Sequence, residues 1–396
     1  MADPKEGLTA SLYIHVPFCA RKCAYCDFYS IPLKPQDPRL EAYPAALLRE
    51  ARMQLNQAGL GHIPTVYIGG GTPSVLGPSG IEALLAGLKK FWGGIQGPSE
   101  ITVEANPESA SEGFLKACRD GGVTRLSLGI QTLHEPSRWA VGRVGAVSAI
   151  QEGLGLAQRI FGADFSVDLI TGLPFQDESV LLRDIATVLS YEPGHVSLYA
   201  LTVEPGTPLA SAQVLAEMGL MDADREGELW IAGRDALESR GYGQYEVSNF
   251  ARPGKESRHN IRYWRMENWL GLGPGASGTL IDDAAGRGVR LTVAPAVEAY
   301  LGRLSRGNAP ERISEALDRR ILMEETLLMG FRYREGPDPV LFRRRFGVDI
   351  EACIPPPILD RWSAEGLLQS APLALTPAGL LHLNAFLAHL LSTTAS

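Results

Sequence analysis

The sequence predicts an α/β protein built on a partial barrel of parallel strands, and two observations support this. Short apolar, β-branched runs alternate with helix-like stretches through the first half of the chain. Glycine, proline and polar residues gather just after the ends of these runs. Alternation of strand and helix indicates right-handed βαβ units and a parallel sheet, in which the active face is at the carboxyl ends of the strands.

The predicted elements of the first half follow in order along the chain. Strands are expected at 12–16, 65–68, 101–104, 124–130, 166–170 and 196–200, with helices around 41–57, 79–91, 111–120, 148–161 and 179–190. Ser79, Ser111 and Ser179 stand where a helix N-cap is wanted. The rhythm therefore predicts a partial (β/α)6, TIM-like barrel that ends near residue 205.

The second half of the chain has a different pattern. A helix is expected at 223–240, followed by a glycine- and aromatic-rich region at 242–278, and then helices at 313–330, 337–346, 358–368 and 373–391. Residues 371–379 resemble a short wing before a terminal helix that starts near Pro377. We expect three parts: the barrel at 1–205, an extension at 206–310, and a mostly helical, winged-helix-like domain at 311–396.

Composition limits the classes of function. The 396 residues are 45% hydrophobic and 21% charged, as in folded proteins, and the net charge of −8 argues against a nucleic-acid partner. Five cysteines are too few for a disulfide scaffold, and an odd number cannot all be paired. No apolar run approaches the roughly 18 residues of a membrane span, and Met1–Ser11 has no apolar core. We expect a cytoplasmic protein that is not an integral membrane protein.

Three of the five cysteines form one cluster. Cys19, Cys23 and Cys26 have the spacing Cys-x3-Cys-x2-Cys in the loop after the first predicted strand, which indicates a metal site. A structural zinc site would want a fourth Cys or His close by, and Asp27 and Phe28 supply none. A four-iron cluster normally takes four cysteines, so three would leave one iron open to another ligand. The cluster is favoured over zinc.

This motif, with the aromatic Tyr25 before its third cysteine, resembles the signature of the radical S-adenosylmethionine (SAM) enzymes. In that family the open iron chelates SAM, and the reduced cluster can cleave it to a 5′-deoxyadenosyl radical. The resemblance implies a 4Fe-4S cluster held by Cys19, Cys23 and Cys26, with SAM beside Tyr25.

The resemblance is closer to the subgroup that contains oxygen-independent coproporphyrinogen III dehydrogenase and a haem chaperone, and it runs from Tyr13 through the terminal helix. Gly69–Pro73, taken alone, is a flexible turn after a strand, but in this place it resembles the glycine motif that contacts the SAM amino group. Each acid or arginine alone would be interpreted as a surface ion pair, whereas their shared place at strand ends favours a pocket. The SAM-binding residues implied by the resemblance are Tyr13, Tyr25, Gly70, Gly71, Thr72, Glu104, Gln131, Arg143 and Asp168.

Two features favour the chaperone branch of the subgroup. The dehydrogenase continues its motif with a fourth cysteine, where this chain has Phe28, and only a dozen residues precede the first strand. His259, in His-Asn-x-x-Tyr-Trp, matches the expected haem-iron ligand of the chaperones, although a lone loop histidine more often satisfies backbone groups.

The resemblance therefore implies that the protein binds haem and passes it to an acceptor, such as a membrane-associated respiratory protein, while SAM and cluster serve regulation or assembly. The alternative is a radical SAM oxidoreductase that acts on a porphyrinogen. The oligomeric state is left open.

Other positions carry less information. Relatives often have a histidine shortly after the Gly-Arg pair, and this chain has Gly145 there. Arg343–Arg345 fit a solvated or partner-facing helix better than a nucleic-acid site, given the acidic chain. Cys118 and Cys353 are expected to be inert thiols.

Overall fold

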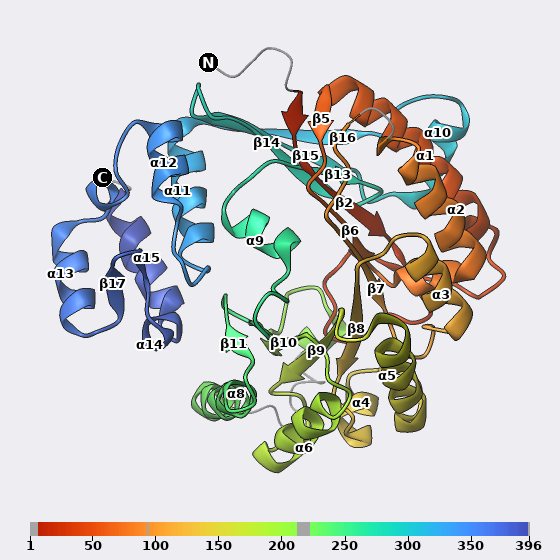
Figure 1. Ribbon diagram of the computed structural model, residues 1–396, viewed down its shortest axis with the longest axis horizontal. Coiled ribbons are helices and arrows are strands. Elements are labelled where there is room, and N and C mark those ends of the chain that lie inside the picture. Colours follow the sequence, from red (N-terminus) through yellow and green to blue (C-terminus); the bar gives the residue numbers. More distant parts are fainter. Residues whose placement is uncertain (1–6, 93–94, 212–221, 395–396) are drawn as a thin grey trace.

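The computed structural model describes residues 7–92, 95–211 and 222–394, and one 12-stranded sheet organises them (Figure 1). Its strands lie in the order β11-β12-β10-β9-β8-β7-β6-β2-β13-β14-β15-β16. The six predicted strands are confirmed as neighbours in one parallel array. They are β2 (Ser11–Val16), β6 (Thr65–Gly70), β7 (Glu100–Ala105), β8 (Arg125–Gln131), β9 (Phe165–Thr171) and β10 (His195–Ala200).

A seventh parallel strand, β13 (Trp269–Leu272), pairs with β2 on its other side, and the sequence interpretation missed it. Gly271 in this strand permits a close approach, because a Cβ there would lie 2.5 Å from the carbonyl oxygen of Ser277. Three antiparallel strands extend the sheet from β13: β14 (Ser277–Asp282), β15 (Arg287–Val293) and β16 (Arg312–Leu317). At the opposite edge, β12 (Asn249–Ala251) and β11 (Gly243–Gln244) are also antiparallel. The short strands are β1 (Leu8–Thr9) with β5 (Leu60–His62), and β3 (Phe18–Cys19) with β4 (Ile31–Pro32).

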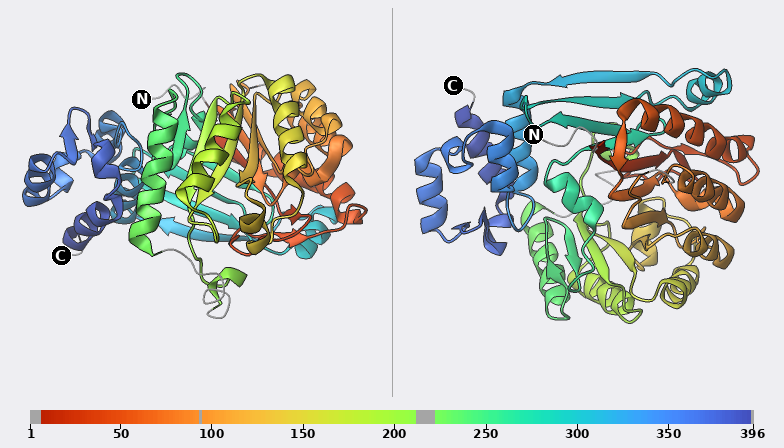
Figure 2. Two further views of the ribbon diagram at one scale, coloured as in Figure 1. Left: turned by 90° about the horizontal axis from the view of Figure 1, so that it is seen from below. Right: turned by 45° about the horizontal axis from the view of Figure 1, so that its top comes forward.

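Helices cover the outer face of the curved sheet (Figures 1 and 2). They are α1 (Pro38–Ala58), α2 (Gly77–Lys89), α3 (Glu112–Asp120), α4 (Glu135–Ala140), α5 (Val147–Phe161), α6 (Glu178–Leu189), α8 (Ala223–Glu238) and α10 (Val297–Ser305). Apolar side chains of these helices, α4 excepted, and of the strands form the larger core. By contrast, α9 (Arg258–Trp264) packs between β6 and α11 on the inner side (Figure 1). None of the helices within the described ranges is long and apolar enough to cross a membrane.

The predicted N-caps are confirmed at one of three places. Ser111 accepts from the Phe114 N–H at the start of α3. The cap predicted at Ser179 is wrong, because the Asp177 carboxylate accepts from the Val180 N–H and caps α6 instead. Ser79 is also wrong, since α2 begins at Gly77 and includes it. A carboxylate makes a stronger capping bond than a hydroxyl, which explains why Asp177 is the cap.

A C-terminal unit, residues 319–394, stands to one side of the barrel (Figure 2). It comprises α11 (Arg319–Gly330), α12 (Pro339–Phe346), α13 (Pro356–Ala364), the hairpin β17 (Leu368–Ser370) and β18 (Leu373–Leu375), α14 (Pro377–Leu380) and α15 (Leu383–Thr394). The hairpin and the helix at Pro377 fit the expected wing. The predicted helix over 313–330 is wrong in its first part: Arg312–Leu317 pair with β15, and ladder hydrogen bonds override their helical pattern.

The three consecutive arginines of α12 are each paired with a carboxylate. Arg343 pairs with Asp349, while Arg344 and Arg345 both contact Asp283, at 2.5 and 2.8 Å. The run therefore does not present three free cations to a polyanion.

Glu50, on α1, connects this helix to α10, to β16 and to the turn after β13. Its carboxylate, 0% exposed, lies 2.5 Å from the Arg312 guanidinium of β16 and accepts from the Tyr300 hydroxyl of α10 at 2.7 Å. It also accepts from the Gly273 N–H at 2.8 Å, in the turn after β13. This buried ion pair fastens α1 to the strands that follow the barrel.

We expect Glu50→Ala to lower the free energy of unfolding by about 3–5 kcal/mol, because it leaves Arg312 with a buried, unpaired charge. Urea denaturation measures the loss. The control is Glu112→Ala, which removes an exposed pair with Lys116 on α3 and should cost about 0–1 kcal/mol. Equal losses in the two variants would contradict the assignment.

Candidate functional site

A cavity of about 390 Å³ lies at the carboxyl ends of the parallel strands. Its wall collects residues from the loop after β2 and from the ends of β6 to β10, as expected for the active face of such a barrel. Eleven of the predicted site residues line it: Cys19, Cys23, Tyr25, Cys26, Gly70, Gly71, Thr72, Glu104, Gln131, Arg143 and Asp168. Tyr13 and His259 are not among the lining residues.

The loop that carries the three cysteines is held at both ends. At its start, the Leu33 N–H donates to the Cys19 carbonyl, and at its end His15 Nε2 lies 2.8 Å from the Tyr29 carbonyl oxygen. In the middle, the Ala24 N–H donates to the Val141 carbonyl at 2.9 Å. The loop is therefore fixed to the barrel before any ligand is bound.

The thiols face one cavity without forming a site for a single ion. Within the described ranges, no group of three or more His, Cys, Asp or Glu side chains is arranged to hold one metal ion. A four-iron cluster asks for something different, because each thiolate then binds a different iron. Burial raises the pKa of Cys19, and that of Cys26 to about 11, so binding of metal would release protons.

The glycine loop packs directly on the start of the cysteine loop. The N–H groups of Gly71 and Thr72 donate to the carbonyls of Val16 and Phe18, at 2.8 and 2.7 Å. A Cβ on Gly71 would lie 2.6 Å from the Phe18 oxygen, and Gly70 has φ 105°. The glycines are thus required for backbone packing at the cavity wall, in addition to the close ligand approach predicted from the sequence.

Two carboxylates line the cavity, Glu104 near the end of β7 and Asp168 in the middle of β9. Glu104 accepts from the Tyr67 hydroxyl at 2.6 Å and from the Gly70 N–H at 3.1 Å, and no ion pair among the described residues includes it. Burial raises the pKa of Glu104 to about 7 and also raises that of Asp168, which accepts from Ser127 at 3.1 Å. A pair of such acids suits a cationic ligand.

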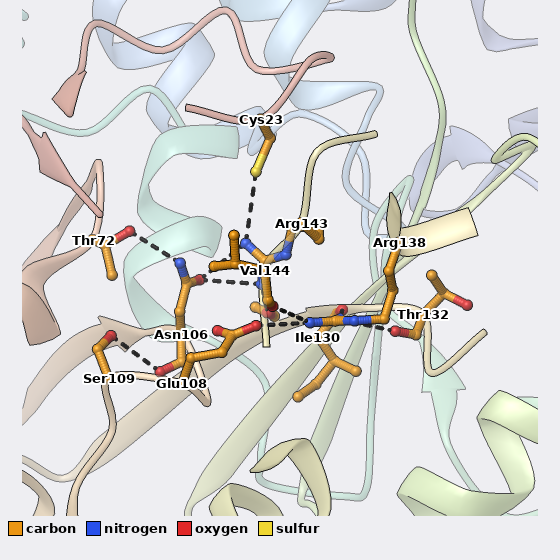
Figure 3. A network of polar contacts seen from close by, with 11 residues as sticks. Cys23, Thr72, Asn106, Glu108, Ser109, Ile130, Thr132, Arg138, Arg143 and Val144 are labelled. Atoms are coloured by element: carbon orange, nitrogen blue, oxygen red, sulfur yellow. Dashed lines mark hydrogen bonds and ion pairs between the residues drawn. The ribbon is translucent and has the colours of Figure 1, made fainter. Parts of the chain in front are cut away.

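Arg143 links the cavity wall to the cysteine loop (Figure 3). Its guanidinium donates to the Gly129 carbonyl and to Asn106 Oδ1, and Nη1 lies 3.8 Å from the sulfur of Cys23. Its buried Nε has no partner, and neither does the buried Oε1 of Gln131, a residue with φ 64°. Two polar atoms without partners, together with the carboxylate of Glu104 that has no ion-pair partner, fit a polar, charged ligand in this cavity.

Asn106, Tyr67 and Tyr199 line the cavity and were missed from the sequence. Asn106 follows Glu104 by two residues, just past the end of β7, so its place at the strand end was a usable signal. Tyr67 is inside β6, and an aromatic residue in a strand gives no sign that it faces a cavity rather than a core.

Tyr13 lies on β2 and His259 on α9, and neither lines the cavity. The Tyr13 hydroxyl is 2.9 Å from His15 Nδ1, and its ring stacks on Tyr67 at 6.3 Å between centroids. His259 is 1% exposed, with Nδ1 2.8 Å from Thr65 Oγ1 and Nε2 2.9 Å from the Tyr263 hydroxyl. Both imidazole nitrogens therefore have partners within the protein. These partners are side-chain hydroxyls and the residue lies in helix α9, so the sequence-based alternative of a loop histidine bonded to backbone groups is not what the structure shows.

Gly145 is explained by its backbone and its neighbour. Its φ of 86° disfavours any other residue, and a Cβ there would overlap the Glu108 side chain. Gly145 is not among the residues that line the cavity, so the departure from relatives leaves the cavity wall intact.

Comparison with known proteins agrees with this geometry. The model of the radical SAM superfamily matches residues 13–186. Radical S-adenosyl methionine domain-containing protein 1, mitochondrial, of Bos taurus is 36% identical over 83% of this chain and 74% of its own length. Heme chaperone HemW of Bacillus subtilis (strain 168) is 32% identical over 92% of this chain and 94% of its own.

The fold also matches a solved structure. Coproporphyrinogen III oxidase (HemN) of Escherichia coli, a radical SAM enzyme, has a TM-score of 0.80 at 22% identity and covers 97% of this chain and 90% of its own. The match confirms the expected α/β barrel class. The two relatives, together with the superfamily match, show that the chain belongs to the radical SAM superfamily and to the family of the HemW proteins.

Proposed function

We propose that the protein is a haem chaperone, which binds haem and transfers it to an acceptor protein, and which carries a SAM-binding 4Fe-4S cluster. The observation that carries the proposal is the similarity to HemW along nearly the whole chain. Phe28 supports it: this residue, 59% exposed, lines the cavity where the dehydrogenase motif has its fourth cysteine. The proposed setting is the cytoplasm, with a respiratory protein as one class of acceptor.

Cys19, Cys23 and Cys26 would hold the cluster, which supplies one-electron chemistry to SAM when bound. The protein's own contribution is placement. Glu104 would accept hydrogen bonds from the SAM ammonium, Arg143 would donate from its unpartnered Nε–H to the carboxylate, and the glycine loop would allow close approach. Asp168 and Gln131 would complete the polar wall toward the ribose.

This proposal includes His259 as the haem-iron ligand, and the contacts of His259 show what must change before it can bind iron. Burial lowers the pKa of His259 to about 3, and Arg262 adds to the shift, so the imidazole is neutral and carries a lone pair at any physiological pH. To reach iron, Nε2 must leave the Tyr263 hydroxyl, and α9 must move from its place between β6 and α11. Haem binding through His259 would therefore be coupled to the opening of α9.

We expect SAM affinity to weaken as the pH falls through 7. The raised pKa of Glu104 means that the empty site holds a neutral acid below about pH 7, and binding an ammonium there requires loss of that proton. The Kd should rise about tenfold per unit below the pKa, measured between about pH 5.5 and 7.5, where the SAM amino group stays protonated. Glu104→Gln should bind SAM weakly and without this pH dependence. Equal affinity across the range in the parent protein would contradict the role of Glu104.

We expect His259→Ala to weaken haem binding by about tenfold or more, because an iron-ligand bond is lost, while the cluster iron content is unchanged. The matched variant Tyr263→Phe keeps the imidazole and frees its Nε2, so its haem affinity should be equal or higher. Titration of the Soret band gives both affinities. An unchanged affinity and spectrum in His259→Ala would remove His259 from the proposal.

The competing function is tested by turnover. Anaerobic incubation of the reconstituted protein with SAM, dithionite and coproporphyrinogen III should give no protoporphyrinogen, while the same preparation binds stoichiometric haem. The Escherichia coli enzyme serves as the positive control. Formation of protoporphyrinogen would replace the chaperone proposal by the oxidoreductase.

A further inference from the structure

Asn106 occupies the one-residue step between β7 and the turn that follows it, and its amide lies between the glycine loop and Arg143 (Figure 3). Nδ2 donates to Thr72 Oγ1 at 3.1 Å. Oδ1 accepts from both Nη1 and Nη2 of Arg143, at 3.3 and 3.4 Å. One side chain therefore joins two loops that each reach a different cysteine.

Each arm ends at a sulfur atom. The Thr72 hydroxyl donates to Cys19 Sγ at 3.5 Å, and Arg143 Nη1 lies 3.8 Å from Cys23 Sγ. Thr72 is 3% exposed and Arg143 is 8% exposed, so water does not compete strongly for either group. The chain Cys19–Thr72–Asn106–Arg143–Cys23 thus connects two of the three thiols through hydrogen bonds.

The orientation of the amide follows from its partners. Arg143 can only donate, so it requires the carbonyl end of Asn106. Thr72 has one hydroxyl hydrogen, and when that hydrogen is directed at Cys19 its oxygen must accept, which requires the NH₂ end. Neither end can be exchanged with the other, and Asn106 therefore fixes the direction in which the Thr72 hydroxyl points.

The backbone of Asn106 and the arginine arm are both held rigidly. The Asn106 N–H donates to Ser74 Oγ at 3.3 Å, and its carbonyl accepts from the N–H groups of Ser109 and Ala110, both at 3.0 Å. On the other side Arg138, 1% exposed, pairs with Glu108 at 2.7 Å and donates to the Val144 carbonyl at 2.7 Å, next to Arg143 (Figure 3).

We propose that Asn106 is a positioning residue that sets the electronic state of the cluster, by holding the hydrogen-bond donors of Thr72 and Arg143 on the sulfurs of Cys19 and Cys23. Hydrogen bonds to cluster sulfurs stabilise the more negative, reduced state and so raise the reduction potential. This role is separate from that of Glu104, which bonds Tyr67 and Gly70 and has no contact in this chain of bonds. It is also independent of haem.

The test compares four variants of the full chain with reconstituted clusters: Asn106→Ala, Thr72→Val, Thr72→Ser and the double variant Asn106→Ala/Thr72→Val. The reduction potential is measured by anaerobic titration, with the electron paramagnetic resonance of the reduced cluster as the signal. Iron and sulfide contents and haem affinity are measured on the same samples. Asn106→Asp is added as a variant of nearly the same size, in case the alanine variant assembles little cluster.

Asn106→Ala and Thr72→Val should each shift the potential to a more negative value, and Thr72→Ser, which keeps the hydroxyl, should retain the parent value. The double variant should shift by less than the sum of the two, because one arm of Asn106 acts through Thr72. Asn106→Asp should also lower the potential, since a carboxylate accepts the Thr72 hydrogen and withdraws it from Cys19. Haem affinity should be unchanged in all of them.

The proposal would be overturned if Asn106→Ala had full iron content and the same reduction potential as the parent protein. If the alanine variant does not assemble the cluster, an unchanged reduction potential in Asn106→Asp would overturn it instead. Strictly additive shifts would show that Asn106 does not act through Thr72. If the parent protein did not bind haem, that result would count against the chaperone function alone, because the reduction potential is measured without haem.

Discussion

A buried carboxylate with no cation beside it is the constraint on which the site depends. Glu104 is the next-to-last residue of β7 and lines the cavity, and its only hydrogen-bond partners in the described residues are the Tyr67 hydroxyl and the Gly70 N–H. Its pKa of about 7 records the cost of charging it there. A positively charged ligand would repay that cost. The same wall offers Arg143 for a carboxylate, so the cavity is complementary to a zwitterion such as the amino-acid end of SAM.

The fold supports this arrangement by fixing the surrounding loops before a ligand arrives. Gly71 and Thr72 bond the backbone on either side of Pro17, and the cysteine loop is tied to His15 and Val141. Arg138 and Glu108 hold the loop of Arg143 from below. Such preorganisation reduces the conformational entropy that binding must otherwise overcome. By contrast, His259 is locked by Thr65 and Tyr263, so the two proposed ligand sites differ in how ready they are to bind.

Local residue spacing and the positions of strand ends were enough to predict most of the residues that line the cavity. The cysteine spacing, the glycines after β6 and the acids at strand ends predicted eleven residues that do line one cavity. This works because parallel strands bring their carboxyl ends together whatever their distance in sequence. Pairing preferences are not local, so β13 was missed and residues 313–317 of β16 were predicted as helix. The burial of His259 was equally hidden, because its partners Thr65 and Tyr67 belong to a strand nearly two hundred residues earlier.

Cys19, Cys23 and Cys26 would hold a four-iron cluster that keeps one iron free to bind SAM in this cavity. Mössbauer spectroscopy of the anaerobically reconstituted protein, with and without SAM, tests it most directly. We expect a four-iron cluster in which SAM changes the signal of one iron and leaves the signals of the other three unchanged. A cluster whose irons all ignore SAM, or a protein that assembles no four-iron cluster, would contradict it.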